Sequence, residues 1–166
     1  MQPQVLELPE LTIHGLSKTF RNRDHSAIKQ LWETLERGFS TCVETCNSRY
    51  GVNKVTDGTI GEFSYTAGVP VAAEEVPAGL QEVDIPAGRY AVARANVGPG
   101  ADFETPEDAV AWVWAEWLPT SDWEGLDELE FIRFDSSFDF TSKVGEVTLA
   151  IPVAKRGTRL ASDFGF

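Results

Sequence analysis

The sequence predicts an α+β fold made of two similar units, each with a strand, a helix and two further strands. Three features occur once in each half. They are a proline-containing strand start (Leu8-Pro9-Glu10; Ile85-Pro86-Ala87), a tryptophan-bearing helix (Trp32; Trp112 and Trp114) and a closing strand (Val69-Pro70-Val71; Ile151-Pro152-Val153). Such a duplication predicts a pseudo-twofold arrangement in which the units share one sheet or face one another. We expect one domain over residues 1–166, with halves at about 1–75 and 76–156.

The first unit begins with a strand and a helix. The strand covers residues 5–20, with bends expected at Pro9 and Gly15. Ser26 is a suitable helix cap. Apolar residues then recur on one helical face, namely Ile28, Leu31, Trp32, Leu35, Phe39, Cys42, Val43 and Cys46. Gly38 predicts a kink or a break, so the helix is one long piece or two short ones.

Two strands complete the first unit. One opens at residues 50–52, and residues 56–58 (Thr-Asp-Gly) have the composition of a hairpin turn. In the next strand, Phe63 and Tyr65 alternate with polar residues, the period-two pattern of a half-buried strand. Pro70 ends this strand, because proline has no N–H to donate to a sheet. Residues 72–79 then connect the two units.

The second unit repeats this order. Its first strand runs over about 83–95, and the turn at 98–100 lacks the glycine spacing and the lysine of a phosphate-binding loop. A helix begins at Thr105-Pro106, with threonine as the cap and proline in the first turn. Its apolar face consists of Val110, Val113, Trp114 and Trp117. Strands over 129–135 and 146–153 complete the unit.

Composition and charge restrict the possible functions. A chain of 166 residues that is 42% hydrophobic suits a folded domain with a buried core. A net charge of −12 argues against nucleic acid, whose phosphates are bound mainly by clustered Lys and Arg, and favours cationic small molecules. The sequence has no secretory signal and no apolar run of membrane-spanning length. We expect a cytoplasmic protein that contacts neither membrane nor nucleic acid directly.

No residue pattern predicts a metal, a cofactor or a catalytic triad. Cys42 and Cys46 share a helical face, but no second pair or nearby histidine completes a zinc site, so small core residues are expected. The acidic loop around Trp123 lacks the spacing of a calcium loop and is expected to be a solvated surface. His14 in a strand and His25 in a loop are expected to be structural or solvated.

Six motifs occur in the order of a known family. They are Tyr50-Gly51-Val52, residues 63–71, residues 85–90, Trp117-Leu118-Pro119, residues 131–135 and residues 145–153. Over nearly the whole chain, this ordered set resembles the GyrI-like effector-binding domain family. That family is the ligand-binding module of AraC-type and multidrug-responsive transcription regulators and also occurs as stand-alone proteins. The resemblance implies β-α-β-β units around a common antiparallel sheet, with two main helices and a central ligand groove.

Departures from the family pattern bear on the chemistry. Relatives often carry a groove glutamate in a Phe-Glu-x-Tyr pattern, and this register places Ile132 at the acid and Phe134 at the tyrosine. A one-step shift would match Glu130 instead, but a one-residue slip turns every side chain to the other face, so we favour Ile132. Asn96 stands where relatives often have a histidine. Glu146, on the neighbouring strand, is a candidate to supply the missing carboxylate.

The expected ligand-binding residues come from both halves. They are Trp32, Phe63, Tyr65, Trp114, Trp117, Ile132, Phe134 and Glu146. Ordinary core packing is the alternative, above all for Trp114 and Trp117. We expect a stand-alone protein that senses or sequesters aromatic, cationic, lipophilic compounds without catalytic residues. One alternative is a hydrolase of cyclopropane-bearing electrophiles, which would need the groove acid. Another is a protein-binding inhibitor of a topoisomerase.

Overall fold

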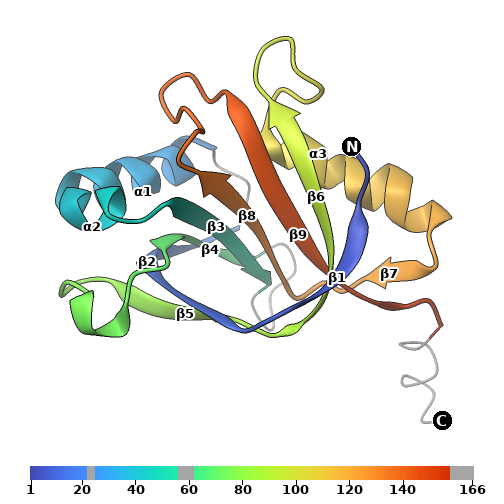
Figure 1. Cartoon of the computed structure of the whole chain (residues 1–166), viewed down its shortest axis with the longest axis horizontal. Helices are drawn as coiled ribbons and strands as arrows, with labels where there is room; N and C mark the ends of the chain where they lie inside the picture. The colour runs from blue at the N-terminus through green and yellow to red at the C-terminus, as the bar shows by residue number, and fades with distance from the viewer. Residues whose placement is uncertain (22–24, 56–61, 158–166) are drawn as a thin grey trace.

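The computed structural model describes residues 1–21, 25–55 and 62–157 (Figure 1). The strands are β1 (Gln4–Leu8), β2 (Leu11–Phe20), β3 (Ser48–Val55), β4 (Phe63–Val69), β5 (Gln81–Ile85), β6 (Gly88–Val97), β7 (Trp123–Gly125), β8 (Leu129–Asp135) and β9 (Gly145–Lys155). The helices are α1 (His25–Gly38), α2 (Ser40–Glu44) and α3 (Pro106–Trp112), and α3 continues into a π-helical turn (Val113–Trp117). Short 3₁₀ turns cover Ala73–Glu75 and Leu118–Thr120. The hairpin turn expected at 56–58 lies outside the described residues.

The strands form one antiparallel sheet in the order β1-β6-β9-β8-β3-β4-β2-β5, and β7 pairs with the end of β9. This order is symmetric about its centre. The set β6-β9-β8 from the second half lies beside the set β3-β4-β2 from the first, so β8 and β3 meet in the middle. The predicted α+β class and the antiparallel sheet of repeated units are therefore confirmed.

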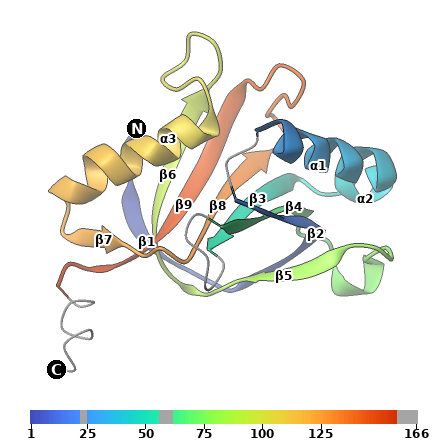
Figure 2. The ribbon, with the colours of Figure 1, turned by 180° about the vertical axis from the view of Figure 1, so that it is seen from behind.

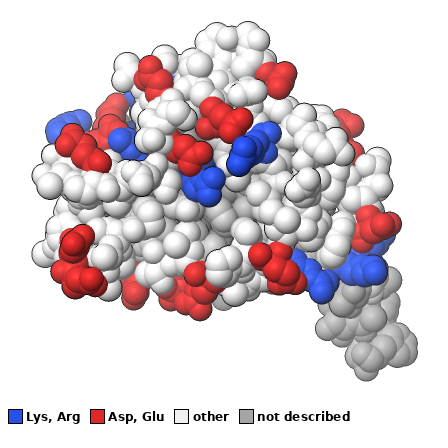
Figure 3. All heavy atoms as spheres, viewed as in Figure 1, with Lys and Arg blue, Asp and Glu red and all other residues white. Residues whose placement is uncertain are grey.

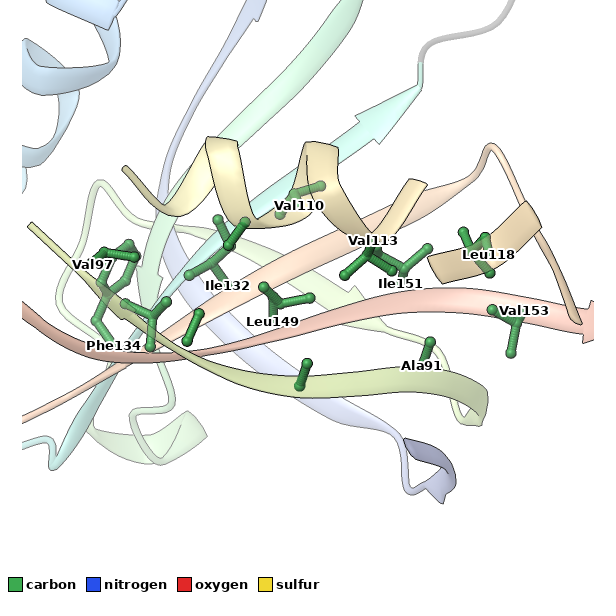
Figure 4. Close-up of a cluster of buried hydrophobic side chains, with 14 of the residues drawn as sticks. Ala91, Val97, Val110, Val113, Leu118, Ile132, Phe134, Leu149, Ile151 and Val153 are labelled. Atoms are coloured by element: carbon green, nitrogen blue, oxygen red, sulfur yellow. The ribbon is translucent and has the colours of Figure 1, made fainter. Parts of the chain in front are cut away.

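Helices α1 and α3 cover the same face of the sheet, which points away from the viewer in Figure 1 and toward the viewer in Figure 2. Helix α1 contacts β2 and β4, while α3 contacts β6 and β9. In Figure 4, Val113 of the π-helical turn after α3 lies beside Ile151 of β9, and both belong to one buried cluster. Leu35 of α1 packs with Ala67 and Val69 of β4. The two helices thus leave β8 and β3 between them.

A second core lies on the opposite face, where the sheet folds over itself. Strands β1 and β2 pair with β6 and β5 in one continuous register, with Leu8 opposite Gly88 and Leu11 opposite Ile85. The predicted bend at Pro9 falls between the two strands. The enclosed residues are Ile13, Tyr50, Val52, Ile85, Tyr90, Leu129, Phe131 and Ala150.

Local predictions about the helices can be checked directly. Thr105 is the expected cap of α3, since its side-chain oxygen accepts a hydrogen bond from the Asp108 N–H at 3.2 Å. The first helix is two pieces, because α1 ends at Gly38 and α2 begins at Ser40. In the described part of the chain, no helix combines the length and the apolar character needed to cross a membrane.

Two expectations about single segments need comment. The acidic loop around Trp123 is not simply a solvated surface, because β7 pairs with β9 and Trp123 lies opposite Lys155. Cys42 and Cys46 are free and half-buried, and they pack against the core cluster around Leu35. Burial raises the pKa of both thiols, which disfavours the reactive thiolate form at neutral pH.

Candidate functional site

A row of polar side chains crosses the centre of the helix-facing side of the sheet. Glu130 of β8 lies opposite Asn53 of β3, and Asn53 lies opposite Tyr65 of β4. Residues directly opposite each other in neighbouring strands share a face, so all three point toward the helices. The Oδ1 atom of Asn53 is buried and has no hydrogen-bond partner among the described residues. The junction of the two halves is therefore polar where the rest of this face is apolar.

A hollow of about 320 Å³ lies at one end of this row. Phe63 and Trp114 form the aromatic part of its wall. The full lining is Asn53, Lys54, Val55, Glu62, Phe63, Trp114, Leu126, Asp127, Glu128 and Glu130, which gives four carboxylates against one lysine. Carboxylates in surplus make the local potential negative. Aromatic walls and negative charge together suit an aromatic cation.

Trp114 and Glu130 are directly coupled in this hollow. The indole Nε1 donates a hydrogen bond to Oε2 of Glu130 at 3.1 Å. The ring lies close over Gly125 of β7, where a Cβ atom would come within 2.4 Å of two ring carbons. Trp114 belongs to the π-helical turn that follows α3, and such turns are frequent at functional sites. The backbone of β7 thus fixes the ring, and the ring holds the carboxylate.

Trp32 and Tyr65 form a second coupled pair, on the side of α1. The Nε1 atom of Trp32 donates to the hydroxyl oxygen of Tyr65 at 3.0 Å. The hydroxyl lies over Gly51 of β3, where a Cβ atom would come within 2.3 Å of it. Burial raises the pKa of Tyr65, and the smaller effect of the Trp32 hydrogen bond opposes it. The phenol therefore stays neutral throughout the physiological range.

Aromatic rings fill the space beyond Trp32. Its ring centroid lies 5.8 Å from that of Phe134 and 5.4 Å from that of Phe140. Phe138 completes the cluster, with its centroid 5.0 Å from those of Phe134 and Phe140. The guanidinium of Arg49 lies 4.4 Å from the Phe140 centroid. We call this cluster (Trp32, Phe134, Phe138, Phe140) the filled end and the hollow beside Trp114 the open end.

The model of the GyrI-like small molecule binding domain matches residues 1–154 of the chain. The chain belongs to this family. A search of curated protein sequences gave no match. Within the described residues, no group of three or more His, Cys, Asp and Glu side chains is arranged to hold a metal ion.

Solved structures of other proteins share the fold of this chain. SAV2435 bound to tetraphenylphosphonium matches with a TM-score of 0.69 at 18% identity, over 93% of this chain and 94% of that one. A putative transcription regulation protein from Staphylococcus aureus MU50 matches with a TM-score of 0.65 at 18% identity, over 92% and 98% of the two chains. The C-terminal domain of EcmrR matches with a TM-score of 0.60 at 14% identity, over 93% and 98%. At these identities the likeness establishes the fold.

The GyrI-like chain brings most of the expected binding residues to the junction of its halves, but it divides them. Phe63 and Trp114 line the open end. Trp32, Tyr65 and Phe134 lie at or beside the filled end. Trp32 contacts both of the others, and none of the three lines the open end.

Three expected binding residues lie elsewhere. Ile132 is 8% exposed and belongs to the core under α3. Trp117 is half-buried against the same core and does not line the open end. Glu146 is exposed at the start of β9, opposite Asn96. Its neighbour Val147 lies opposite Phe134 and faces the helices, so the side chain of Glu146 points to the other face.

The register argument against Glu130 is wrong. Glu130 and Ile132 are two residues apart on β8, so both face the helices, and a match to Glu130 does not reverse the strand. Glu130 lines the open end, whereas Ile132 is buried. The GyrI-like chain therefore has a carboxylate at the junction of its halves. Glu130 lies two residues before Ile132, the position that the sequence favours for the acid. The sequence does not predict a role for Asn53, because nothing in the local pattern indicates that its side chain faces a hollow.

Proposed function

We propose that this protein binds lipophilic aromatic cations in its open end, with Glu130 as the counter-charge. The observation that carries the proposal is the Trp114–Glu130 pair, in which an indole forms the wall of the hollow and holds the carboxylate at 3.1 Å. A cation beside this pair is attracted by the ring face and by the charge. Cation–π attraction contributes about 0.5–2 kcal/mol, and a hydrogen bond or contact to a charged group about 1.5–3 kcal/mol.

Other features support a cationic ligand. The net charge is −12, and acidic side chains are spread over several parts of the surface in Figure 3. A long-range negative potential speeds the arrival of cations, and salt weakens this effect. The structure of SAV2435 was solved with tetraphenylphosphonium, a cation of this class. Binding of this kind serves sequestration of the compound or, through a separate DNA-binding protein, its sensing.

The proposal is tested by titration with matched ions. Tetraphenylphosphonium and tetraphenylborate have the same shape and opposite charge, and tryptophan fluorescence reports binding of both. We expect the wild type to prefer the cation. We expect Glu130→Gln to weaken cation binding by about 1.5 kcal/mol or more, which is roughly tenfold in Kd.

Glu146→Gln is the matched control, because it removes the same charge from an exposed site on the other face of the sheet. We expect it to leave the Kd unchanged within about twofold at physiological salt, since surface charges are screened. Equal affinity of the wild type for the two ions, or equal losses in the two variants, would contradict a counter-charge role for Glu130.

A second candidate function is hydrolysis of cyclopropane-bearing electrophiles. The observation in its favour is the carboxylate of Glu130 beside a hollow, since such chemistry needs a positioned acid or base. The Tyr65 hydroxyl is a weaker candidate partner, because it is buried and already accepts from Trp32. Turnover that Glu130→Gln abolishes while binding of a neutral substrate analogue persists would favour this reaction. Saturable binding without turnover would exclude it.

A further inference from the structure

The loop between β8 and β9 places a phenylalanine where a ligand ring would find aromatic partners. Phe140 is half-buried, and its ring contacts Trp32 and Phe134 at centroid distances of 5.4 and 5.0 Å. Arg49 covers the ring at 4.4 Å and also pairs with Glu36 of α1. Phe140 is thus enclosed by the face-and-edge contacts that a bound aryl group would make.

This loop is held mainly by bonds within itself. One carboxylate oxygen of Asp139 accepts hydrogen bonds from the backbone N–H groups of Thr141 and Ser142, at 2.9 and 3.2 Å. The backbones of Asp139 and Val144 exchange two further bonds, at 2.9 and 3.2 Å. Lys143 has a φ of 58°, an unfavourable conformation for a residue with a side chain. The tip can therefore move as one unit without losing these internal bonds.

We propose that Phe140 occupies a second aryl site of the protein, and that ligands with several aryl rings displace it. This inference rests on the proposed function. On binding, one ligand ring takes the place of Phe140 against Trp32 and Phe134, and the loop tip swings outward. Phe138 is 7% exposed and packs beside Gly145, so it anchors the base of the loop.

Size favours this exchange, and charge does not oppose it. The open end, at about 320 Å³, lies at the lower limit of small-molecule pockets, which run from about 300 to 1,000 Å³. The place of Phe140 would give a cation with several aryl rings room beyond the open end, whose lining includes none of the filled-end residues. Departure of Phe140 also exposes Arg49, but the carboxylate of Glu36 already pairs with that guanidinium. The exposed site would then not repel a cation.

The test compares a four-ring cation with a single-ring cation on two variants. Tetraphenylphosphonium needs the second site, whereas benzyltrimethylammonium fits the open end alone. Phe140→Ala should strengthen tetraphenylphosphonium binding by about tenfold, because it removes the cost of opening that lowers apparent affinity. Binding of benzyltrimethylammonium should stay the same. Phe103→Ala is the control, since the half-buried Phe103 ring pairs with Trp112 at a centroid distance of 6.4 Å and, among the described residues, makes no ring contact with Trp32, Phe134 or Phe140.

Several outcomes would overturn the inference. Weaker binding of tetraphenylphosphonium to Phe140→Ala would show that Phe140 forms part of the wall of the site. Equal changes in the Kd of both cations would show that Phe140 affects the open end indirectly. Hydrogen exchange on the wild type gives a second readout that needs no variant. Amide protection over residues 136–144 should fall when tetraphenylphosphonium binds and stay constant with benzyltrimethylammonium. Increased protection would mean that the loop closes on the ligand.

Failure here is distinguishable from failure of the proposed function. If benzyltrimethylammonium binds the wild type and Glu130→Gln abolishes that binding, the open end is a cation site whatever Phe140 does. If neither cation binds the wild type or Phe140→Ala, both proposals are wrong. If Phe140→Ala does not fold, Phe140→Leu replaces it. Phe140→Leu should also strengthen tetraphenylphosphonium binding, by a smaller factor.

Discussion

The two halves of the sheet contain the same kind of hydrogen-bonded pair, in different surroundings. In each half, a helix-borne tryptophan donates its indole N–H to a strand residue, and a glycine lets a ring approach the backbone. Trp32 donates to the neutral hydroxyl of Tyr65, which is 6% exposed. Trp114 donates to the carboxylate of Glu130 beside a hollow. A symmetric fold therefore carries one neutral pair with a buried acceptor and one charged pair beside a hollow.

The difference between the two pairs predicts that protein stability and the proposed ligand binding depend on different residues. A buried pair of neutral groups contributes to folding because each group satisfies the other. A carboxylate beside a hollow carries a net charge that can attract a cationic ligand. Substitutions in the Trp32 pair should therefore change stability first, and substitutions in the Trp114 pair should change binding first.

The largest expected effect comes from Gly51→Ala. Its Cβ would come within 2.3 Å of the Tyr65 hydroxyl oxygen, so the ring must move and the bond to Trp32 breaks. We expect a loss of about 3 kcal/mol in the free energy of unfolding, the upper range for overpacking a core. Urea denaturation measures it.

Gly38→Ala is the control for this substitution, because nothing lies within 4 Å of a Cβ at this position at the end of α1. We expect it to change stability by less than about 1 kcal/mol, in the stabilising direction if the helix propensity of alanine decides the result. Similar losses in the two variants would show that the clash with Tyr65 is not the cause.

A smaller effect is expected from Tyr65→Phe. The indole N–H of Trp32 then has no acceptor, and an unsatisfied buried donor costs about 1–3 kcal/mol. We expect a loss of about 1.5 kcal/mol in urea denaturation, with the Kd for benzyltrimethylammonium unchanged within about twofold. A tenfold loss of binding in this variant, with stability unchanged, would reverse the roles assigned to the two pairs.

The smallest expected effect is a pH dependence. Burial raises the pKa of Tyr65 in the folded protein, whereas the unfolded chain releases this proton near pH 10. The stabilisation is therefore complete below pH 10 and is lost as the pH rises toward the folded pKa. Between pH 10 and 11 the wild type should lose about 1 kcal/mol more than Tyr65→Phe does. Parallel pH profiles of the two proteins would contradict the burial of the hydroxyl.

The sequence predicted the fold well because the fold depends on repeated local patterns. The alternation around Phe63 and Tyr65 and the cap at Thr105 are properties of neighbouring residues, and both appear in the structure. The repeated proline motifs and tryptophan helices predicted a duplicated unit, and the resemblance to the GyrI-like family implied the common antiparallel sheet that the structure shows.

The candidate site was harder to predict because it depends on residues far apart in the chain. Asn53, Trp114 and Glu130 meet only through the pairing of β3 with β8 and the position of the π-helical turn. Apolar spacing does not distinguish Trp114, which lines the hollow, from Trp117, which packs on the core. Glu130 lies two residues from Ile132 on β8, so matching the family's acid to Glu130 keeps the same face of the strand. Only a slip of one residue would reverse it.

The continuous ladder from β1 to β2 along β6 and β5 has a consequence for the kinetics of folding. Its pairs run from Gln4 with Val92 to Gly15 with Gln81, so the paired residues lie 88 to 66 positions apart in the sequence (92 − 4 and 81 − 15). Closing such long loops costs entropy before any contact compensates for it, and folding slows as the sequence distance between contacts grows. During synthesis, β1 remains unpaired until the ribosome has synthesised β6. The nascent first half is then an open sheet edge that invites mispairing with other chains.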